Sequence, residues 1–283
     1  MSTTTIHKGS ALSRSNLVLS HWSVRAIFAA LLVLVLAIAV LFTLVPAVVV
    51  VVLSFSNEKL MIFPPREWGF RQYETLADAS FWLEAVRTSF GLAVSAAVMT
   101  LVIAVPAAIA LNRGQVWGRQ IITGAGLAPL ILPGVAYAVA VYMVFLQARM
   151  VGSPVWVVLV YAAHAFPYVL LIVGTALNRI PKELELVAMT LGASKSRATM
   201  NITVRLLVQA MAAAFVFAFI SSFDESTLIV FIGGPGLVTL PKGIFDSLRT
   251  GMDPVVLAIS TILMVFTGIL AAVASYWRSN STR

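Results

Sequence analysis

The sequence has no cysteine, few charged residues and no recognisable catalytic motif. Without cysteine, the 283-residue chain forms no disulfide and performs no thiol chemistry. Charged residues make up 11% of the sequence, whereas about 25% is usual in soluble domains. A chain with so few charges cannot cover its surface with polar side chains. The composition therefore excludes a soluble enzyme and a disordered protein.

Metal, nucleotide and nucleophile motifs are also missing. The three histidines, His7, His21 and His164, are scattered and form no H-E-x-x-H sequence. Lys195-Ser196 is preceded by none of the glycines that a phosphate-binding loop requires. We therefore predict no catalytic residue, no metal ligand and no cofactor in this chain. His164 is either a proton carrier within the membrane or a hydrogen-bonded packing residue, and its isolation favours packing.

Long hydrophobic runs dominate what the sequence does contain. Hydrophobic residues make up 60% of the chain, and the mean hydropathy is +0.98. A bilayer core of roughly 30 Å needs about 20 apolar residues of helix. Six segments meet this requirement: Ala26–Ser54, Thr88–Leu111, Ile121–Gln147, Val155–Leu177, Leu206–Ile232 and Pro254–Trp277. We predict an all-α membrane protein with six transmembrane helices, in which Pro129 and Pro133 kink or break the third.

The surplus of basic residues predicts the orientation of the chain. Lys and Arg number 19 against 11 Asp and Glu, which gives a net charge of +8. Sorted by alternate loops, one side holds twelve basic and two acidic residues, and the other holds seven of each. The positive-inside rule predicts that the basic side, with both termini, is cytoplasmic. We expect cytoplasmic tails over 1–25 and 278–283 around a permease domain over 26–277, and no nucleic-acid partner.

The most informative segment is the predicted cytoplasmic loop 178–205. Pro181 and the helix-forming residues after it predict a helix over Lys182–Leu191 with an apolar stripe. Gly192 permits a turn, and Ser194 can cap a second helix that runs into the fifth span. Such a hairpin is larger than a connection requires. The stripe either binds a partner protein or packs on the ends of the chain's own helices, and the sequence leaves both readings open.

This loop resembles the EAA loop of type I ABC importer permeases, whose pattern is roughly E-A-A-x-x-x-G-A. Ala188, Gly192 and Ala193 match the pattern, whereas Leu186 stands where the family usually has its glutamate, one residue after Glu185. The resemblance implies a coupling helix that docks on a separate ATPase subunit. The coupling residues that it implies are Glu185, Ala188, Gly192, Ala193, Ser194 and Lys195.

The resemblance continues towards the C-terminus and covers most of the chain. The matching motifs are Ser222-Phe223-Asp224-Glu225, Gly233-Gly234-Pro235-Gly236, Thr239-Leu240-Pro241 and Met252-Asp253-Pro254. In this order they look like the second permease of spermidine/putrescine-type importers, a group that includes opine and aminophosphonate permeases. The resemblance implies a MetI-like fold in the bacterial inner (plasma) membrane. It also implies four kinds of partner: a second homologous permease, two copies of an ATP-binding subunit that hold ATP and Mg, an extracytoplasmic substrate-binding protein, and the lipid bilayer.

Two adjacent acidic residues, Asp224 and Glu225, lie inside the predicted fifth span. An acidic side chain near the middle of a bilayer costs about 2.5–3.5 kcal/mol on insertion scales, so it usually faces a cavity or a partner. One hypothesis is that these residues, with Ser222, line the substrate path or gate and attract an ammonium group. The alternative is that they contact the partner permease or pair with a basic residue of this chain: Arg87, Lys242 or Arg249.

Together these features predict a non-enzymatic permease subunit of an ATP-driven, binding-protein-dependent importer. Its substrate would be a small, amine-containing solute such as a polyamine, and the chain would form half of the translocation path. The alternative is a stand-alone secondary transporter driven by an ion gradient, which inverted repeats with paired broken helices would favour. The sequence shows no convincing repeat between its halves.

Overall fold

The structure, a computed structural model, describes residues 11–114, 116–251 and 253–280, with side chains from 27 to 269 except at 115 and 252. Met252 and the outer parts of both predicted tails lie outside these described residues. The chain divides into two compact units: Met1–Glu74 with Pro254–Arg283, and Thr75–Asp253. The regular elements of the described residues are helices, apart from one isolated bridge between Ser56 and Trp68. The all-α prediction is confirmed.

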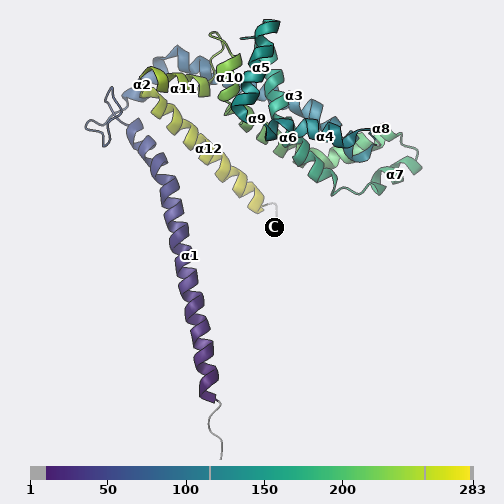
Figure 1. The fold of residues 1–283 in the computed structure, drawn as a ribbon, viewed down its shortest axis with the longest axis horizontal. Coiled ribbons are helices and arrows are strands. Elements are labelled where there is room, and N and C mark those ends of the chain that lie inside the picture. Colours follow the sequence, from purple (N-terminus) through teal and green to yellow (C-terminus); the bar gives the residue numbers. More distant parts are fainter. Residues whose placement is uncertain (1–10, 115, 252, 281–283) are drawn as a thin grey trace, which may run out of the picture. The chain divides into compact units, whose positions relative to one another are not determined.

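The first unit contains α1 (Ala11–Ser54) and α12 (Val255–Asn280), which contact each other (Figure 1). The large apolar side chains of α1 from Ile27 to Val48 are exposed all round the helix. A helix that is apolar on every side is stable only when lipid or protein covers it. Its composition therefore identifies α1 as a membrane span.

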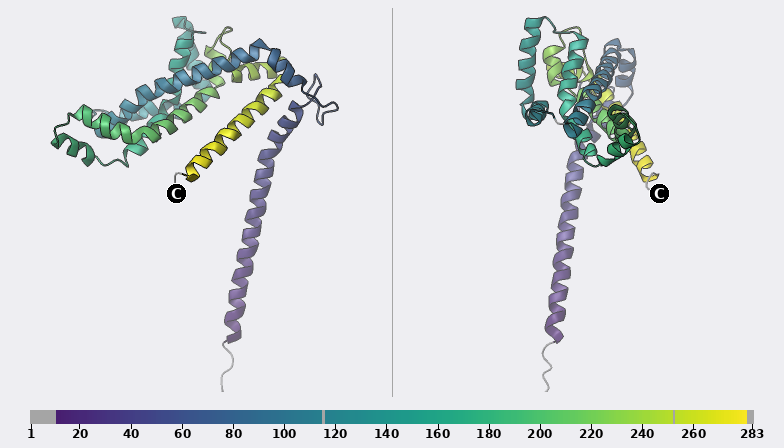
Figure 2. Two further views of the ribbon diagram at one scale, coloured as in Figure 1. Left: turned by 180° about the vertical axis from the view of Figure 1, so that it is seen from behind. Right: turned by 90° about the vertical axis from the view of Figure 1, so that its right-hand side faces the viewer.

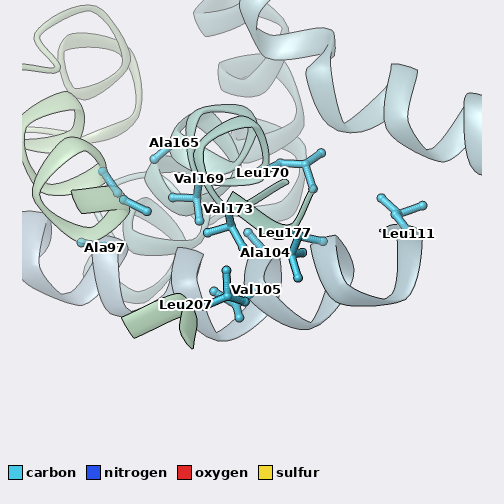
Figure 3. Close-up of a cluster of buried hydrophobic side chains, with 13 residues drawn as sticks. Ala97, Ala104, Val105, Leu111, Ala165, Val169, Leu170, Val173, Leu177 and Leu207 are labelled. Atoms are coloured by element: carbon cyan, nitrogen blue, oxygen red, sulfur yellow. The ribbon is translucent and has the colours of Figure 1, made fainter. Parts of the chain in front are cut away.

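The second unit is built on three long helices: α3 (Ser80–Arg113), α6 (Pro154–Leu177) and α9 (Arg205–Phe223). They lie side by side in Figures 1 and 2. Figure 3 shows that small side chains line their shared core, with Ala97 and Ala104 from α3 near Ala165 and Val173 from α6. Small residues let helix backbones approach closely, and such packing is what holds membrane helices together.

A bent pair of helices, α4 (Arg119–Ile131) and α5 (Gly134–Ala148), occupies the place of the predicted third span. The chain bends by 107° between the two helices. Pro133 directly precedes α5, and proline has no N–H with which to continue the hydrogen-bond ladder of α4. The break predicted from the prolines is therefore confirmed. The short helix α10 (Thr227–Ile232) packs against α5 and forms a second core with it.

The described residues test the six predicted spans in part. Among the described residues four helical runs are long and apolar enough to cross a membrane, or five if the bent pair counts as one span. The last predicted span corresponds to α12, whose described apolar part, Val255–Ile269, is short for a crossing. The predicted fifth span is wrong beyond Phe223, because α9 ends there and Asp224 begins a break. After this break, α10 and α11 (Leu240–Thr250) are separate short helices.

Candidate functional site

A helical hairpin connects α6 to α9 and lies at one end of the three-helix core (Figures 1 and 2). Its first helix, α7, spans Glu183–Thr190, and Gly192 then turns the chain with a φ of +92°. That dihedral lies in the region that favours glycine, because it has no Cβ. The side chain of Ser194 accepts a hydrogen bond from the N–H of Arg197 and caps the next helix. The predicted helix, turn and cap are confirmed.

The second arm of the hairpin reaches α9 without a break. It consists of α8 (Lys195–Ala198) and a π-helical segment, η1 (Thr199–Val204), which continues directly into α9. Short π-helical segments within α-helices are rare and occur mostly at functional sites. Any displacement of the hairpin tip is therefore passed to α9 through a continuous backbone.

The apolar stripe predicted for α7 is exposed at Leu184, Val187 and Leu191, and its fourth residue, Ala188, is half-buried. We name Leu184, Leu186, Val187 and Leu191 the apolar ridge; their exposed fractions are 42%, 59%, 57% and 83%. Ala188 is half-buried, and its carbonyl accepts the N–H of Ala193 in the turn. Of the two readings of the stripe, packing on the core of its own unit does not occur. The ridge is available to a partner protein.

Glu185 points the other way from the ridge and is 8% exposed. Its carboxylate accepts hydrogen bonds from the hydroxyls of Thr199, at 3.3 Å, and Thr203, both in η1. Oε1 also lies 3.5 Å from Nε of Arg113, at the end of α3. One side chain of the first arm thus binds the second arm and the core. The site prediction grouped Glu185 with the residues of the hairpin tip, but the structure separates it from them.

The end of α3 holds the beginning of the hairpin as well. Nη2 of Arg113 donates to the carbonyl of Ile180 at 2.8 Å, and Nδ2 of Asn112 donates to Oδ1 of Asn178 at 2.6 Å. Arg113 therefore contacts both the start of the hairpin and Glu185. Arg113 is one of the twelve basic residues from which the orientation was predicted, and no other role was predicted for it. Two sequence features could have indicated this contact. Arg113 is in the last turn of an apolar helix, and Glu185 is on the side of α7 opposite the apolar ridge.

The remaining predicted coupling residues form the tip. Gly192, Ser194 and Lys195 are exposed, and Ala193 is half-buried. Lys195 also borders an apolar groove between α3 and the second arm. The tip and the apolar ridge thus form one exposed surface with a basic edge.

The acidic pair lies in the break between α9 and α10, not inside a helix as predicted. Asp224 is exposed, whereas the side chain of Glu225 is 14% exposed. Oε1 of Glu225 accepts the N–H of Leu228 at 2.9 Å and so caps the first turn of α10. The hydroxyl of Tyr161 donates to the carbonyl of Glu225 at 3.0 Å. The two acids therefore have different surroundings.

The partner of the Glu225 side chain is a histidine. Nε2 of His164, in the middle of α6, lies 3.3 Å from Oε2 of Glu225. The ring of Tyr137, from α5, stacks on the imidazole with centroids 6.3 Å apart. Sequence analysis favoured a packing role for His164 and did not connect it with Glu225. Their 61-residue separation carries no local signal.

None of the three basic residues considered for the acidic pair forms an ion pair with it in the described part of the chain. Lys242 is buried, and its ammonium donates to the carbonyls of Gly234 and Leu237 instead. Ser222 is 4% exposed, and its hydroxyl has no hydrogen-bond partner among the described residues. Within the same residues, no group of three or more His, Asp or Glu side chains could hold a metal ion.

Comparisons with known proteins agree with this architecture. Residues 100–278 match the family described as "Binding-protein-dependent transport system inner membrane component". The crystal structure of a bacterial ABC transporter involved in import of the acidic polysaccharide alginate shares the fold, with a TM-score of 0.67 and 18% identity. The match covers 89% of this chain and 96% of that chain.

Two relatives from Escherichia coli (strain K12) match most of the chain. The putrescine transport system permease protein PotI is 28% identical over 253 residues, which cover 86% of this chain and 89% of the relative. The spermidine/putrescine transport system permease protein PotC is 25% identical over 243 residues, which cover 84% of this chain and 90% of the relative. Such permeases work with a binding protein, and a partner subunit handles ATP, which excludes the stand-alone secondary transporter. The chain belongs to the family of binding-protein-dependent transport system inner membrane components, and is a multi-pass transport subunit with no catalytic activity of its own.

Proposed function

We propose that this chain is the second-permease-type subunit of an ATP-driven importer for a small, polyamine-like solute. In this proposal it forms half of the translocation path and pairs with a second, homologous permease. Two copies of an ATP-binding subunit drive the pair, and an extracytoplasmic binding protein delivers the substrate. The names of PotI and PotC support the polyamine-like substrate.

The observation that carries the coupling role is the hairpin with its exposed apolar ridge. Leu191, at the tip, is 83% exposed, whereas Glu185, on the opposite side of α7, contacts Thr199 and Arg113. A rigid apolar projection of this kind fits a groove on another protein. With the basic side cytoplasmic, the hairpin faces the compartment that supplies ATP.

In this proposal Glu185 stabilises the hairpin from inside and does not contact the ATPase. The ridge and tip contact the ATPase, whereas Glu185 ties the hairpin to α3 and to η1. Movement of the ATPase is thereby transmitted to two core helices at once. Leu186, which replaces the usual glutamate of the family pattern, is part of the apolar contact surface.

The acidic pair supports the amine substrate. Asp224 is exposed and has no ion-pair partner among the described residues, so its carboxylate is available to a cation. Glu225 lies beside it, and Ser222, two residues before Asp224, contributes a hydroxyl without a partner among the described residues. These three residues form the path or gate of the proposal, in agreement with a cationic solute.

A glycine-to-aspartate pair of variants tests the coupling role. Gly192→Asp places a charged side chain on the tip, at a φ of +92°, while Gly118→Asp makes the same change at another glycine with a positive φ, +72°. An added Cβ meets no atom within 4 Å at either position, so each variant carries only backbone strain, about 1–3 kcal/mol. In the reconstituted importer, Gly192→Asp should abolish substrate-stimulated ATPase activity or capture of the ATPase subunit, and Gly118→Asp should retain both. Normal stimulation in Gly192→Asp contradicts the proposed docking.

Uptake assays test the substrate and the path. Wild-type importer in proteoliposomes should accumulate putrescine or spermidine against a gradient when ATP is supplied to the ATPase side. Asp224→Asn should reduce this uptake, because the exposed carboxylate is lost without any change in side-chain size. Failure of the wild type to import either amine contradicts the substrate class. Undiminished uptake by Asp224→Asn contradicts the role of that residue.

A further inference from the structure

The pair formed by His164 and Glu225 lies near the middle of the apolar helix α6. His164 follows Pro154, the first residue of α6, by ten positions. At 1.5 Å per residue it is about 15 Å along the helix, which is half of a bilayer core of roughly 30 Å. Both side chains keep some access, with 20% of His164 and 14% of Glu225 exposed. Neither side chain is therefore completely enclosed by the described residues.

An uncompensated carboxylate at this depth is unfavourable, so Glu225 needs a cation. Neither salt bridges nor hydrogen bonds connect it to a lysine or arginine of the described residues. Protonated His164 supplies one positive charge at 3.3 Å and makes the pair neutral. An ammonium group beside Glu225 would do the same if His164 gave up its proton. The pair thus has two neutral states that differ in which cation is present.

One nitrogen of this pair lacks a hydrogen-bond partner among the described residues. Nδ1 of His164 is buried without a hydrogen-bond partner among the described residues, and so is the hydroxyl of Ser222. While His164 is protonated, Nδ1 is a donor with no acceptor among the described residues, which is unfavourable. After one proton leaves, a ring nitrogen becomes an acceptor for an ammonium N–H. The stacked ring of Tyr137 offers an aromatic face, which also attracts cations.

We propose that His164 and Glu225 form a proton-linked binding site for one ammonium group of the substrate. The ammonium takes its place beside the carboxylate of Glu225, and His164 releases one proton to water in the path. When the ammonium moves on, His164 takes up a proton again and restores the neutral pair. This inference rests on the proposed amine substrate and assigns the residues that bind it.

Few other titratable groups of the described residues lie near the pair. Those of the neighbouring elements are Tyr137 on α5, Tyr161 and Tyr168 on α6, and Asp224 in the break. Tyr161 is occupied as a donor to the carbonyl of Glu225. Asp224 is exposed and can attract the ammonium towards the pair.

Proton release measures the exchange directly. Putrescine would be titrated into the purified, assembled importer at several pH values between 5 and 8, where imidazoles change charge. Released protons would be counted by calorimetry in buffers of different ionisation enthalpy. We expect release of at most one proton per putrescine bound at this site, and the released number should change with pH. His164→Gln should bind putrescine with no release, whereas Glu84→Gln, at an exposed acid of α3, should behave as the wild type.

A second measurement keeps the test independent of any variant. Nitrogen-15 NMR of the imidazole distinguishes protonated from neutral His164, whose signal is assigned by its absence from His164→Gln. Under conditions where the signal reports the protonated form, putrescine should convert it to the neutral form, and uncharged 1,4-butanediol should not. An unchanged signal, an equal response to the diol, or proton release that persists in His164→Gln would overturn the proposal. If the exchange occurs but the wild type imports no amine, the site stands and the proposed transport substrate is wrong.

Discussion

Replacing Glu185 with alanine tests whether this residue is an internal connection of the coupling hairpin. The carboxylate binds two hydroxyls of η1 and lies 3.5 Å from Nε of Arg113. The two charged side chains are only 11% and 7% exposed, so solvent screens the pair little. Removal of one partner of a buried ion pair costs about 3–5 kcal/mol, because the other charge stays buried. We therefore expect Glu185→Ala to lower the free energy of opening the hairpin by about 3 kcal/mol.

Amide hydrogen exchange of the assembled importer measures this opening. Since each 1.4 kcal/mol is a factor of ten, about 3 kcal/mol predicts exchange roughly 100-fold faster in peptides that cover Glu183–Ala198. Glu185→Gln retains acceptor capacity for a hydroxyl and should fall between alanine and the wild type. Glu183→Ala is the matched control, because Glu183 is an exposed acid on the same helix and its loss should change stability by less than about 0.5 kcal/mol. Equal exchange in Glu185→Ala and the wild type, or equal acceleration by both alanine variants, would refute the internal role.

Three further substitutions test the packing around both sites, each by thermal unfolding in lipid nanodiscs. Lys242→Met keeps the aliphatic stem but removes the ammonium from two loop carbonyls, and should cost about 1.5–3 kcal/mol, with faster amide exchange in the loop before α11. Tyr161→Phe removes the hydrogen bond to the carbonyl of Glu225 and should cost about 1 kcal/mol; an unchanged melting temperature would contradict this. Gly126→Ala places a Cβ 2.8 Å from an aromatic carbon and should cost about 1–3 kcal/mol, whereas Gly124→Ala enters open space and should not.

Periodicity, turn chemistry and composition predicted the local structure of the hairpin well. The helix after Pro181, the turn at Gly192 and the cap at Ser194 all depend on neighbouring residues, and all are confirmed. The break at Pro133 is confirmed for the same reason, since a proline ends a hydrogen-bond ladder wherever it occurs. The family assignment depended on the order of several short motifs and is confirmed as well.

The fifth span shows where this reasoning failed. Hydropathy averaged over Leu206–Ile232 hides the two acids, so a continuous helix was predicted. In the structure the side chain of Glu225 caps α10 by accepting the N–H of Leu228, which stabilises a new helix start. An average of hydropathy does not represent such a side-chain hydrogen bond. It therefore did not predict that α9 ends at Phe223.

The sequence by itself determined that this chain is a helical membrane protein with a helix–turn–helix hairpin before α9, because composition and local spacing are properties of neighbouring residues. Tertiary structure alone decided the partners of its charges. Arg113 and Glu185 are 72 positions apart, and His164 and Glu225 are 61 apart, so no local pattern joins them. Their pairing follows from the packing of α3, α6 and α9, which brings distant segments together where an unpaired charge would be costly.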